Sequence, residues 1–170
     1  MDSSGNIPVL YIVCDMSGSM NESCGKFLLM RGVIRAVEQF FRLGYGHADL
    51  KTIFWNSKVN LPDWDFNNEI PAQITDCYGK ANINMLRDYL ALQSAGKMLI
   101  LSDGWFDLND LVKWGKALPH NTLKIIKIGS DANPLLKGEG VFSPDDLFLA
   151  LDKWLPCVGT KQENITEDEW

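Results

Sequence analysis

The sequence lacks several features that would point directly to a class of function. It has no apolar run of the roughly 18–20 residues that a membrane-spanning helix needs. Its net charge is −6, so it lacks the basic excess of nucleic-acid-binding proteins. The N-terminal stretch MDSSGNIP contains an acid and no basic residue, unlike a secretory signal. We therefore expect a soluble cytoplasmic protein that binds neither membranes nor nucleic acid.

Residues and motifs typical of catalytic or zinc sites are also scarce. The chain has four cysteines without a C-x-x-C pair and two histidines, which argues against a structural zinc site. It contains no G-x-G-x-x-G, and none of its Gly-Lys pairs has the spacing of a phosphate-binding loop. It also lacks the G-x-S-x-G of an α/β-hydrolase nucleophile. Cys14 lies inside an apolar run, and we expect it in the core.

What the chain does contain is an alternation of short apolar runs and longer amphipathic segments. With 46% hydrophobic residues in 170, one domain with a sizeable core is expected. The apolar runs predict strands over 8–14, 49–55, 58–61, 97–102, 122–128 and 141–142. The periodic segments predict helices over 24–43, 82–93, 108–118 and 144–155, the last with Ser143 as its N-cap.

This alternation predicts an α/β fold, a doubly wound and mostly parallel central sheet with helices on both faces. We expect residues 1–157 to form this domain. The polar and acidic stretch over 158–170 has no apolar period and predicts a disordered tail.

Two of the predicted strands are followed by an aspartate. Asp15 follows the apolar run PVLYIVC, and Asp103 follows KMLILS. Ligands of doubly wound sheets bind at the carboxyl ends of the strands, so we expect these two carboxylates to meet there. Ser17 and Ser19 extend the first of them to D-x-S-x-S. A helix cap would also favour Asp and Ser at these positions, but it does not account for Asp103.

The stretch DMSGS, the strand before it and the later Asp103-Gly104 resemble the metal-ion-dependent adhesion site (MIDAS) of the von Willebrand factor A (vWA) domain family. The resemblance covers roughly residues 7–155. It implies a vWA/Rossmann-like fold and a site for Mg²⁺, or for Mn²⁺ or Ca²⁺, with Asp15, Ser17, Ser19 and Asp103 as ligands. Hard cations prefer oxygen ligands, and neutral serine oxygens leave the metal able to accept a carboxylate from a partner.

The sequence departs from the family pattern at one ligand. The family's threonine stands in a G-G-T-N-like stretch, and the matching stretch here is GKAN, with Ala81 at the threonine position. Ala81 has no side-chain oxygen, which leaves Asn82, Thr75 and Asp76 as candidate replacements. A weakened or vestigial metal site therefore stays open as an alternative.

The resemblance implies a protein–protein interaction module and not an enzyme, with an acidic side chain of the partner completing the metal coordination. Trp105, Phe106 and Tyr78 lie near the same predicted edge and are candidate partner contacts, with packing into the core an equal alternative for all three. The similarity to small stand-alone bacterial vWA proteins implies a partner such as a MoxR-type AAA+ ATPase, a kinase or phosphatase, or a tellurium-resistance-type stress system.

Two other functions remain open from the sequence. One is a metal-dependent hydrolase that uses the same aspartates, although no general base or nucleophile is visible near them. The other is a degenerate vWA domain that binds its partner without metal. A phosphatase of the haloacid dehalogenase type is disfavoured, because Ser17 stands where its D-x-D motif needs a second acid.

Overall fold

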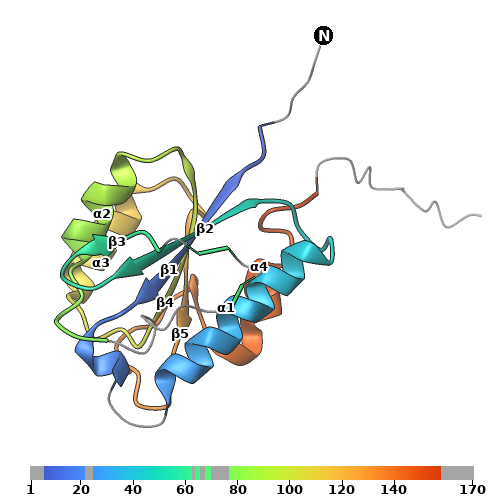
Figure 1. Ribbon diagram of the computed structural model, residues 1–170. Coiled ribbons are helices and arrows are strands. Elements are labelled where there is room, and N and C mark those ends of the chain that lie inside the picture. Colours follow the sequence, from blue (N-terminus) through green and yellow to red (C-terminus); the bar gives the residue numbers. More distant parts are fainter. Residues whose placement is uncertain (1–5, 22–24, 63, 66–67, 70–76, 158–170) are drawn as a thin grey trace, which may run out of the picture.

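The computed structural model describes residues 6–21, 25–62, 64–65, 68–69 and 77–157. These residues form a six-stranded sheet in the order β3-β2-β1-β4-β5-β6, with helices on both faces (Figure 1). The strands are β1 (Val9–Asp15), β2 (Asp49–Trp55), β3 (Val59–Asn60), β4 (Gly96–Ser102), β5 (Leu123–Lys127) and β6 (Val141–Phe142). The helices are α1 (Lys26–Arg42), α2 (Ile83–Ala91), α3 (Leu108–Ala117) and α4 (Leu147–Leu151), with the 3-10 turns η1 (Gly18–Asn21) and η3 (Pro144–Asp146).

β1 is a central strand of the sheet and has a neighbouring strand on each side. β1 pairs in parallel with β2 on one side and with β4 on the other. β5 and β6 continue in parallel, while β3 pairs antiparallel with β2. The strand order therefore reverses between β1 and β4, which is where doubly wound sheets bind ligands. Asp15 ends β1 and Asp103 directly follows β4, so both predicted acids stand at this switch point.

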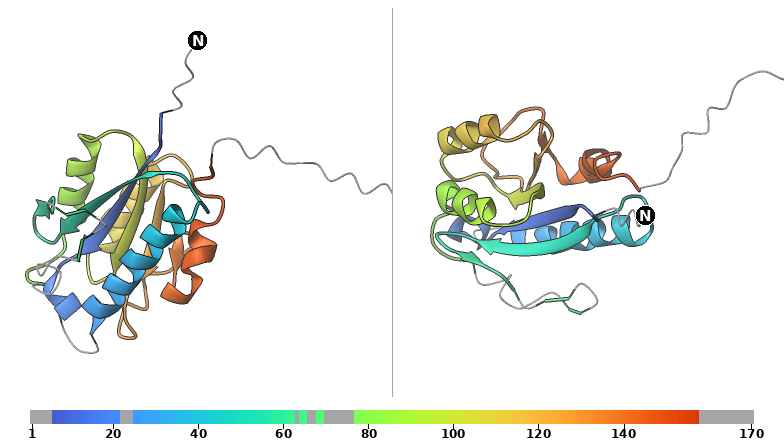
Figure 2. Two further views of the ribbon diagram at one scale, coloured as in Figure 1. Left: turned by 45° about the vertical axis from the view of Figure 1, so that its right-hand side comes forward. Right: turned by 90° about the horizontal axis from the view of Figure 1, so that it is seen from above.

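Each face of the sheet packs against one pair of helices. α1 and α4 cover one face, and α2 and α3 cover the other (Figure 1, Figure 2). Side chains of β1 alternate between the two cores: Ile12 and Cys14 belong to the cluster with α1 and α4, and Tyr11 and Val13 to the cluster with α2 and α3. Burial on both faces explains why the first strand is an unbroken apolar run, and it confirms Cys14 as a core residue.

The end of the domain differs from its prediction. The expected helix over 144–155 is the short turn η3 followed by α4, which ends at Leu151. Lys153 adopts a left-handed φ of 56°, which turns Trp154 into the core, where its indole N–H donates to the Asn121 carbonyl at 2.7 Å. Ser143 does not cap the backbone, and its hydroxyl bonds the Asp146 carboxylate at 3.0 Å. Tertiary packing of Trp154 thus overrides the local helical pattern.

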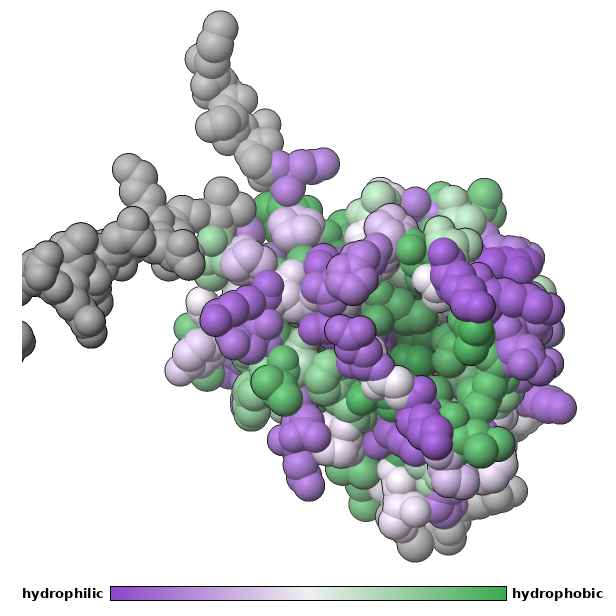
Figure 3. All heavy atoms as spheres, turned by 180° about the vertical axis from the view of Figure 1, so that it is seen from behind, coloured by the Kyte–Doolittle hydropathy of each residue, from purple (hydrophilic) through white to green (hydrophobic). Residues whose placement is uncertain are grey.

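The surface is mixed in character. Seen from behind, hydrophilic side chains surround a hollow in which apolar side chains gather (Figure 3). No helix among the described residues has the length and apolar character needed to cross a membrane. The predicted tail over 158–170 lies outside the described residues and stays a prediction.

Candidate functional site

The carboxylate of Asp15 lies fully buried at the end of β1. One oxygen, Oδ1, accepts the Ser17 backbone N–H at 2.9 Å, and Oδ2 accepts the Ser102 hydroxyl at 2.5 Å. The Ser102 oxygen in turn accepts the Gly104 N–H at 2.9 Å, so the ends of β1 and β4 are tied together through one carboxylate. Burial raises the pKa of Asp15 to about 6, although the hydrogen bonds from Ser102 and Ser17 act to lower it. The nearby charge of Asp103 adds to the increase.

The two serines of the D-x-S-x-S stretch bring their hydroxyl groups together. Ser17 Oγ and Ser19 Oγ lie 3.2 Å apart, and Ser17 is buried. The bond from the Ser17 N–H to Asp15 folds the chain back just after the strand, which sets this geometry. Neighbouring oxygens of an octahedral Mg²⁺ site with bonds of about 2.1 Å lie about 3.0 Å apart. The pair therefore has the spacing of two adjacent ligands of a hard cation.

The loop after β1 is held by the segment that precedes α2. The Gly18 N–H donates to the Gly79 carbonyl at 2.8 Å, and the Tyr78 N–H donates to the Met16 carbonyl at 2.9 Å. These bonds place the 77–82 segment beside the two serines, as the match to the family's threonine loop predicts.

A lysine that the sequence analysis did not single out lies against Asp103. Lys26 is the first residue of α1, and its side chain is only 1% exposed. Its Nζ lies 2.9 Å from Asp103 Oδ2 and 3.0 Å from Asp131 Oδ2. Burial alone would lower the pKa of Lys26, but the hydrogen bonds and charges of Asp103 and Asp131 outweigh it and raise the pKa. The ammonium form of Lys26 is therefore favoured at this site.

The loop after β5 fixes this lysine in place. Gly129 has a φ of +95°, and a Cβ atom there would come within 2.7 Å of Lys26 Cδ, so only glycine lets the alkyl stem lie this close. The same loop supplies Asp131. The indole N–H of Trp105 donates to the Asp131 carbonyl at 3.2 Å, and the Trp105 backbone N–H donates to Asp103 Oδ1 at 3.3 Å.

Ala81 and the candidate replacements for the family's threonine differ in where they lie. Ala81 is buried in the apolar cluster with α2 and α3 and offers no oxygen. Asn82 is the N-cap of α2, and its Oδ1 accepts the Met85 N–H at 3.2 Å. Thr75 and Asp76 lie outside the described residues. The described chain thus uses the Asn82 side chain to cap a helix.

The aromatic residues predicted as partner contacts divide into surface and core. Trp105 is 48% exposed, and Tyr78 is also exposed. Phe106 is 7% exposed, and its ring packs against Trp55 at a centroid distance of 5.6 Å. Phe106 is therefore mainly a core residue, and its remaining surface lines the pocket beside the loop after β4.

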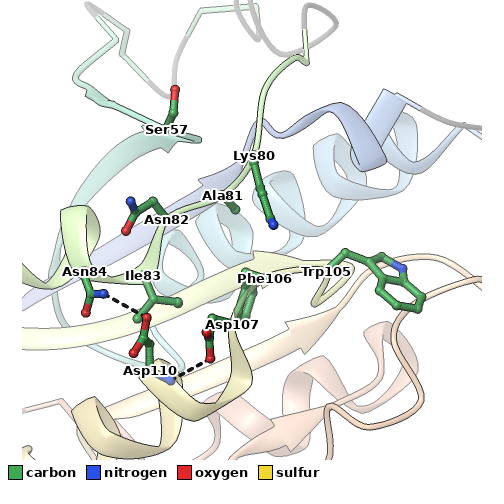
Figure 4. Close-up of a pocket in the computed structure, with 10 residues that line it drawn as sticks. All are labelled: Ser57, Lys80, Ala81, Asn82, Ile83, Asn84, Trp105, Phe106, Asp107 and Asp110. Carbon is green, nitrogen blue, oxygen red and sulfur yellow. Dashed lines mark hydrogen bonds between the residues drawn. The ribbon is translucent and has the colours of Figure 1, made fainter.

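A pocket of about 640 Å³ lies beside Trp105 and Phe106, at the edge of the sheet that bears Asp15 and Asp103 (Figure 4). It lies between the loop before α2 and the loop after β4. The Lys80 side chain points across it toward the loop with Trp105 and Phe106. Its lining is polar and apolar and consists of Ser57, Lys80, Ala81, Asn82, Ile83, Asn84, Trp105, Phe106, Asp107 and Asp110.

Asp15, Ser17 and Ser19 fit a hard divalent cation, but the contact of Asp103 with Lys26 conflicts with one. No three His, Cys, Asp or Glu side chains among the described residues cluster so as to hold a metal, so a cation at this edge depends on the serine hydroxyls. Ser17 and Ser19 have suitable spacing, and Asp15 lies beside them to balance charge. The conflict is at Asp103, whose Oδ2 already accepts a hydrogen bond from Lys26.

Three residues at this edge of the sheet were not predicted from the sequence, namely Lys26, Ser102 and Asp131. A signal existed for Lys26, because it falls in register with Met30 and Val33 on the apolar stripe of the first helix, where a charged residue is out of place. Ser102 is the polar last residue of an otherwise apolar strand. For Asp131, which lies in a loop without a recognisable motif, the sequence carries no such signal.

Comparisons with known proteins identify the fold. No family model matches the chain, and no curated protein matches it in sequence. Among solved structures, the manganese-loaded TRAP protein of Plasmodium vivax superposes with a TM-score of 0.59 at 12% identity, over 88% of this chain and 74% of that one. An aerotolerance-related membrane protein from Bacteroides fragilis gives 0.51 at 15% identity, over 72% and 68%. These are vWA-domain structures. The chain has a vWA-like fold.

A third vWA-like neighbour is proximal thread matrix protein 1 from the mussel byssus, solved with a zinc-occupied MIDAS motif. Its TM-score is 0.53 at 14% identity, and the alignment covers 85% of this chain and 45% of the mussel protein. This chain therefore spans about half the length of the mussel protein. At these identities the likeness is one of fold, and it confirms the predicted doubly wound vWA/Rossmann-like architecture.

Proposed function

We propose that this vWA-like chain is a metal-dependent protein–protein interaction module that binds an acidic side chain of its partner. The observation that carries the proposal is the pair of hydroxyls of Ser17 and Ser19, 3.2 Å apart beside the buried Asp15 at the switch point of the sheet. The manganese of one similar structure and the zinc-occupied MIDAS of another support a divalent metal in general. We propose Mg²⁺, with Mn²⁺ or Ca²⁺ as substitutes, because the donors are hard oxygens.

The residues at this edge of the sheet would have different roles in binding the cation and the partner. Ser17 and Ser19 provide direct ligands, and Asp15 and Asp103 balance charge. A bound Mg²⁺ would supply an open coordination position for the partner's carboxylate. Trp105 and Tyr78 offer exposed aromatic surface on the same rim, which suits the apolar part of a binding segment.

We propose binding and not hydrolysis because neither histidine, the side chain that most often acts as general base, lies at this edge of the sheet. The chain has two histidines, His47 and His120. His47 precedes β2 and His120 precedes β5, so both stand at the amino edge of the sheet, opposite Asp15. A hydrolytic site on the same aspartates would have to work without either imidazole.

The family resemblance extends the proposal to the partner and its location. We propose a cytoplasmic partner from a MoxR-type AAA+ ATPase, kinase, phosphatase or tellurium-resistance-type system.

The test is a capture experiment with the tagged full chain in a native lysate, run with Mg²⁺ and with EDTA. The double variant Ser17→Ala/Ser19→Ala removes the two hydroxyls, and Trp105→Ala removes the exposed rim aromatic. Leu149→Ala, an exposed apolar residue of α4, serves as the matched control. We expect a partner that is retained in Mg²⁺ and by the control, and lost in EDTA and by the serine variant. A partner retained under every condition would refute the metal-dependent mechanism.

A further inference from the structure

We propose that Lys26 is a built-in competitor of the divalent cation at this site. Its ammonium neutralises Asp103 in the metal-free chain, and a cation gains the help of Asp103 only when Lys26 releases it. This inference rests on the proposed function, because it concerns the same cation site.

Asp103 is the carboxylate for which the Lys26 ammonium and the divalent cation would compete. Asp103 is fully buried, and its two oxygens accept the Lys26 ammonium at 2.9 Å and the Trp105 backbone N–H at 3.3 Å. A divalent cation that shares this carboxylate would stand close to the ammonium. Two cations in a buried, poorly screened space repel each other strongly, so both cannot use Asp103 fully at once.

Lys26 has a second carboxylate acceptor close by, that of Asp131. Asp131 Oδ2 lies 3.0 Å from the same Nζ, and Asp131 is 41% exposed, so its charge is partly solvated. A small shift of the ammonium toward Asp131 would keep Lys26 paired while freeing Asp103. The alkyl stem lies against Gly129, which limits the movement to the end of the side chain.

The consequence is that Asp103 is neutralised without metal, and that the site binds metal weakly by itself. Lys26 keeps Asp103 paired in the empty state, so the fold does not depend on the cation. The cation must offset the loss of one ion pair, and a partner's carboxylate would add the missing stabilisation. Metal binding would then be tied to the arrival of the partner.

The experiment compares the wild-type chain with Lys26→Met, which has a similar length and no charge. Mn²⁺ binding is measured by electron paramagnetic resonance, and thermal unfolding is followed in EDTA and in Mn²⁺. We expect Lys26→Met to bind Mn²⁺ at least about tenfold more tightly, because the repulsion is gone. Its melting temperature should fall in EDTA, where Asp103 is unpaired, and rise markedly with Mn²⁺. The wild-type melting temperature should respond little.

Lys80→Met is the matched control. Lys80 is an exposed lysine at the rim, so this variant loses the same formal charge without touching Asp103. Its Mn²⁺ affinity should change by less than about threefold, since exposed charges are screened by solvent.

Each outcome decides a different claim. Equal Mn²⁺ affinity of the wild-type chain and Lys26→Met would overturn the competition while leaving the cation site in place. Absence of Mn²⁺ binding in both would overturn the proposed metal site itself, and the competition with it. If Lys26→Met does not fold in EDTA, folding must be restored by Mn²⁺, and failure to restore it would overturn the inference.

Discussion

Replacement of Asp15 by asparagine is expected to stabilise the metal-free fold at neutral pH and to lose this effect in acid. Full burial raises the pKa of Asp15 from 3.8 to about 6. The folded chain therefore holds a proton on Asp15 more readily than the unfolded chain does. The stability that this proton affinity provides is fully present below about pH 4 and is lost as the pH rises through about 6.

The size of the effect follows from the distance between the two pKa values. A difference of about two pH units corresponds to about 3 kcal/mol of folding free energy lost by pH 8. The Asp15→Asn variant avoids this loss because its amide does not ionise. It gives up about 1 kcal/mol, since the Ser102 hydroxyl must reorient around the new NH₂ group. We therefore expect the variant to be more stable than the wild type by about 2 kcal/mol at pH 8 and less stable by about 0.5 kcal/mol at pH 4, where part of the loss from ionisation is already present.

Urea unfolding in EDTA at pH 4, 6 and 8 measures these differences. Asp88→Asn is the control, because Asp88 is an exposed aspartate of α2, and its difference from the wild type should stay small at each pH. A stability difference for Asp15→Asn that is independent of pH, or a wild type that is the more stable protein at pH 8, would refute the assignment of a raised pKa to a buried Asp15.

Three further substitutions test the loop after β5 and the helix α3. Gly129→Ala is expected to lower the free energy of unfolding by about 2 kcal/mol, because the new Cβ would meet Lys26 at 2.7 Å on a backbone with φ of +95°. Gly115→Ala, at an open position inside α3, should raise it by about 0.5–1 kcal/mol, and equal effects of the two changes would contradict the close approach of Lys26. Asp107→Ala should lower it by about 1 kcal/mol, since Asp107 caps α3; an unchanged urea midpoint would show that the cap is dispensable.

Most of the fold could be predicted from sequence because its signals are local. The strand over 49–55 matches β2, and the other predicted strands and the first three helices are present with bounds that differ by at most two residues. Buried parallel strands are unbroken apolar runs, and amphipathic helices repeat every 3.6 residues. The last helix was predicted too long because its end depends on the docking of Trp154, a tertiary contact that no local pattern encodes.

The positions of Asp15 and Asp103 could also be predicted, but the ion pair at Asp103 could not. Asp15 and Asp103 were placed by topology alone, because carboxyl ends of parallel strands share one edge. The ion pair from Lys26 to Asp103 joins a helix start to a strand end, and Asp131 enters from the loop after β5. The place of Lys26 on the apolar stripe of its helix marks it as unusual, but no sequence pattern names Asp103 or Asp131 as its partner.

The distribution of charge shows which part of the site needs a cation. Lys26 pairs with Asp103 and Asp131, whereas the donors to Asp15 are neutral, namely the Ser17 N–H and the Ser102 hydroxyl. Above its pKa of about 6, Asp15 is thus a buried anion stabilised by neutral hydrogen bonds. The unmet demand for positive charge therefore lies at Asp15 and the adjacent hydroxyls of Ser17 and Ser19, and not at Asp103. A divalent cation held mainly by Asp15, Ser17 and Ser19 would offset the cost of burying the charged carboxylate of Asp15. Binding of that cation should weaken as Asp15 takes up a proton below pH 6.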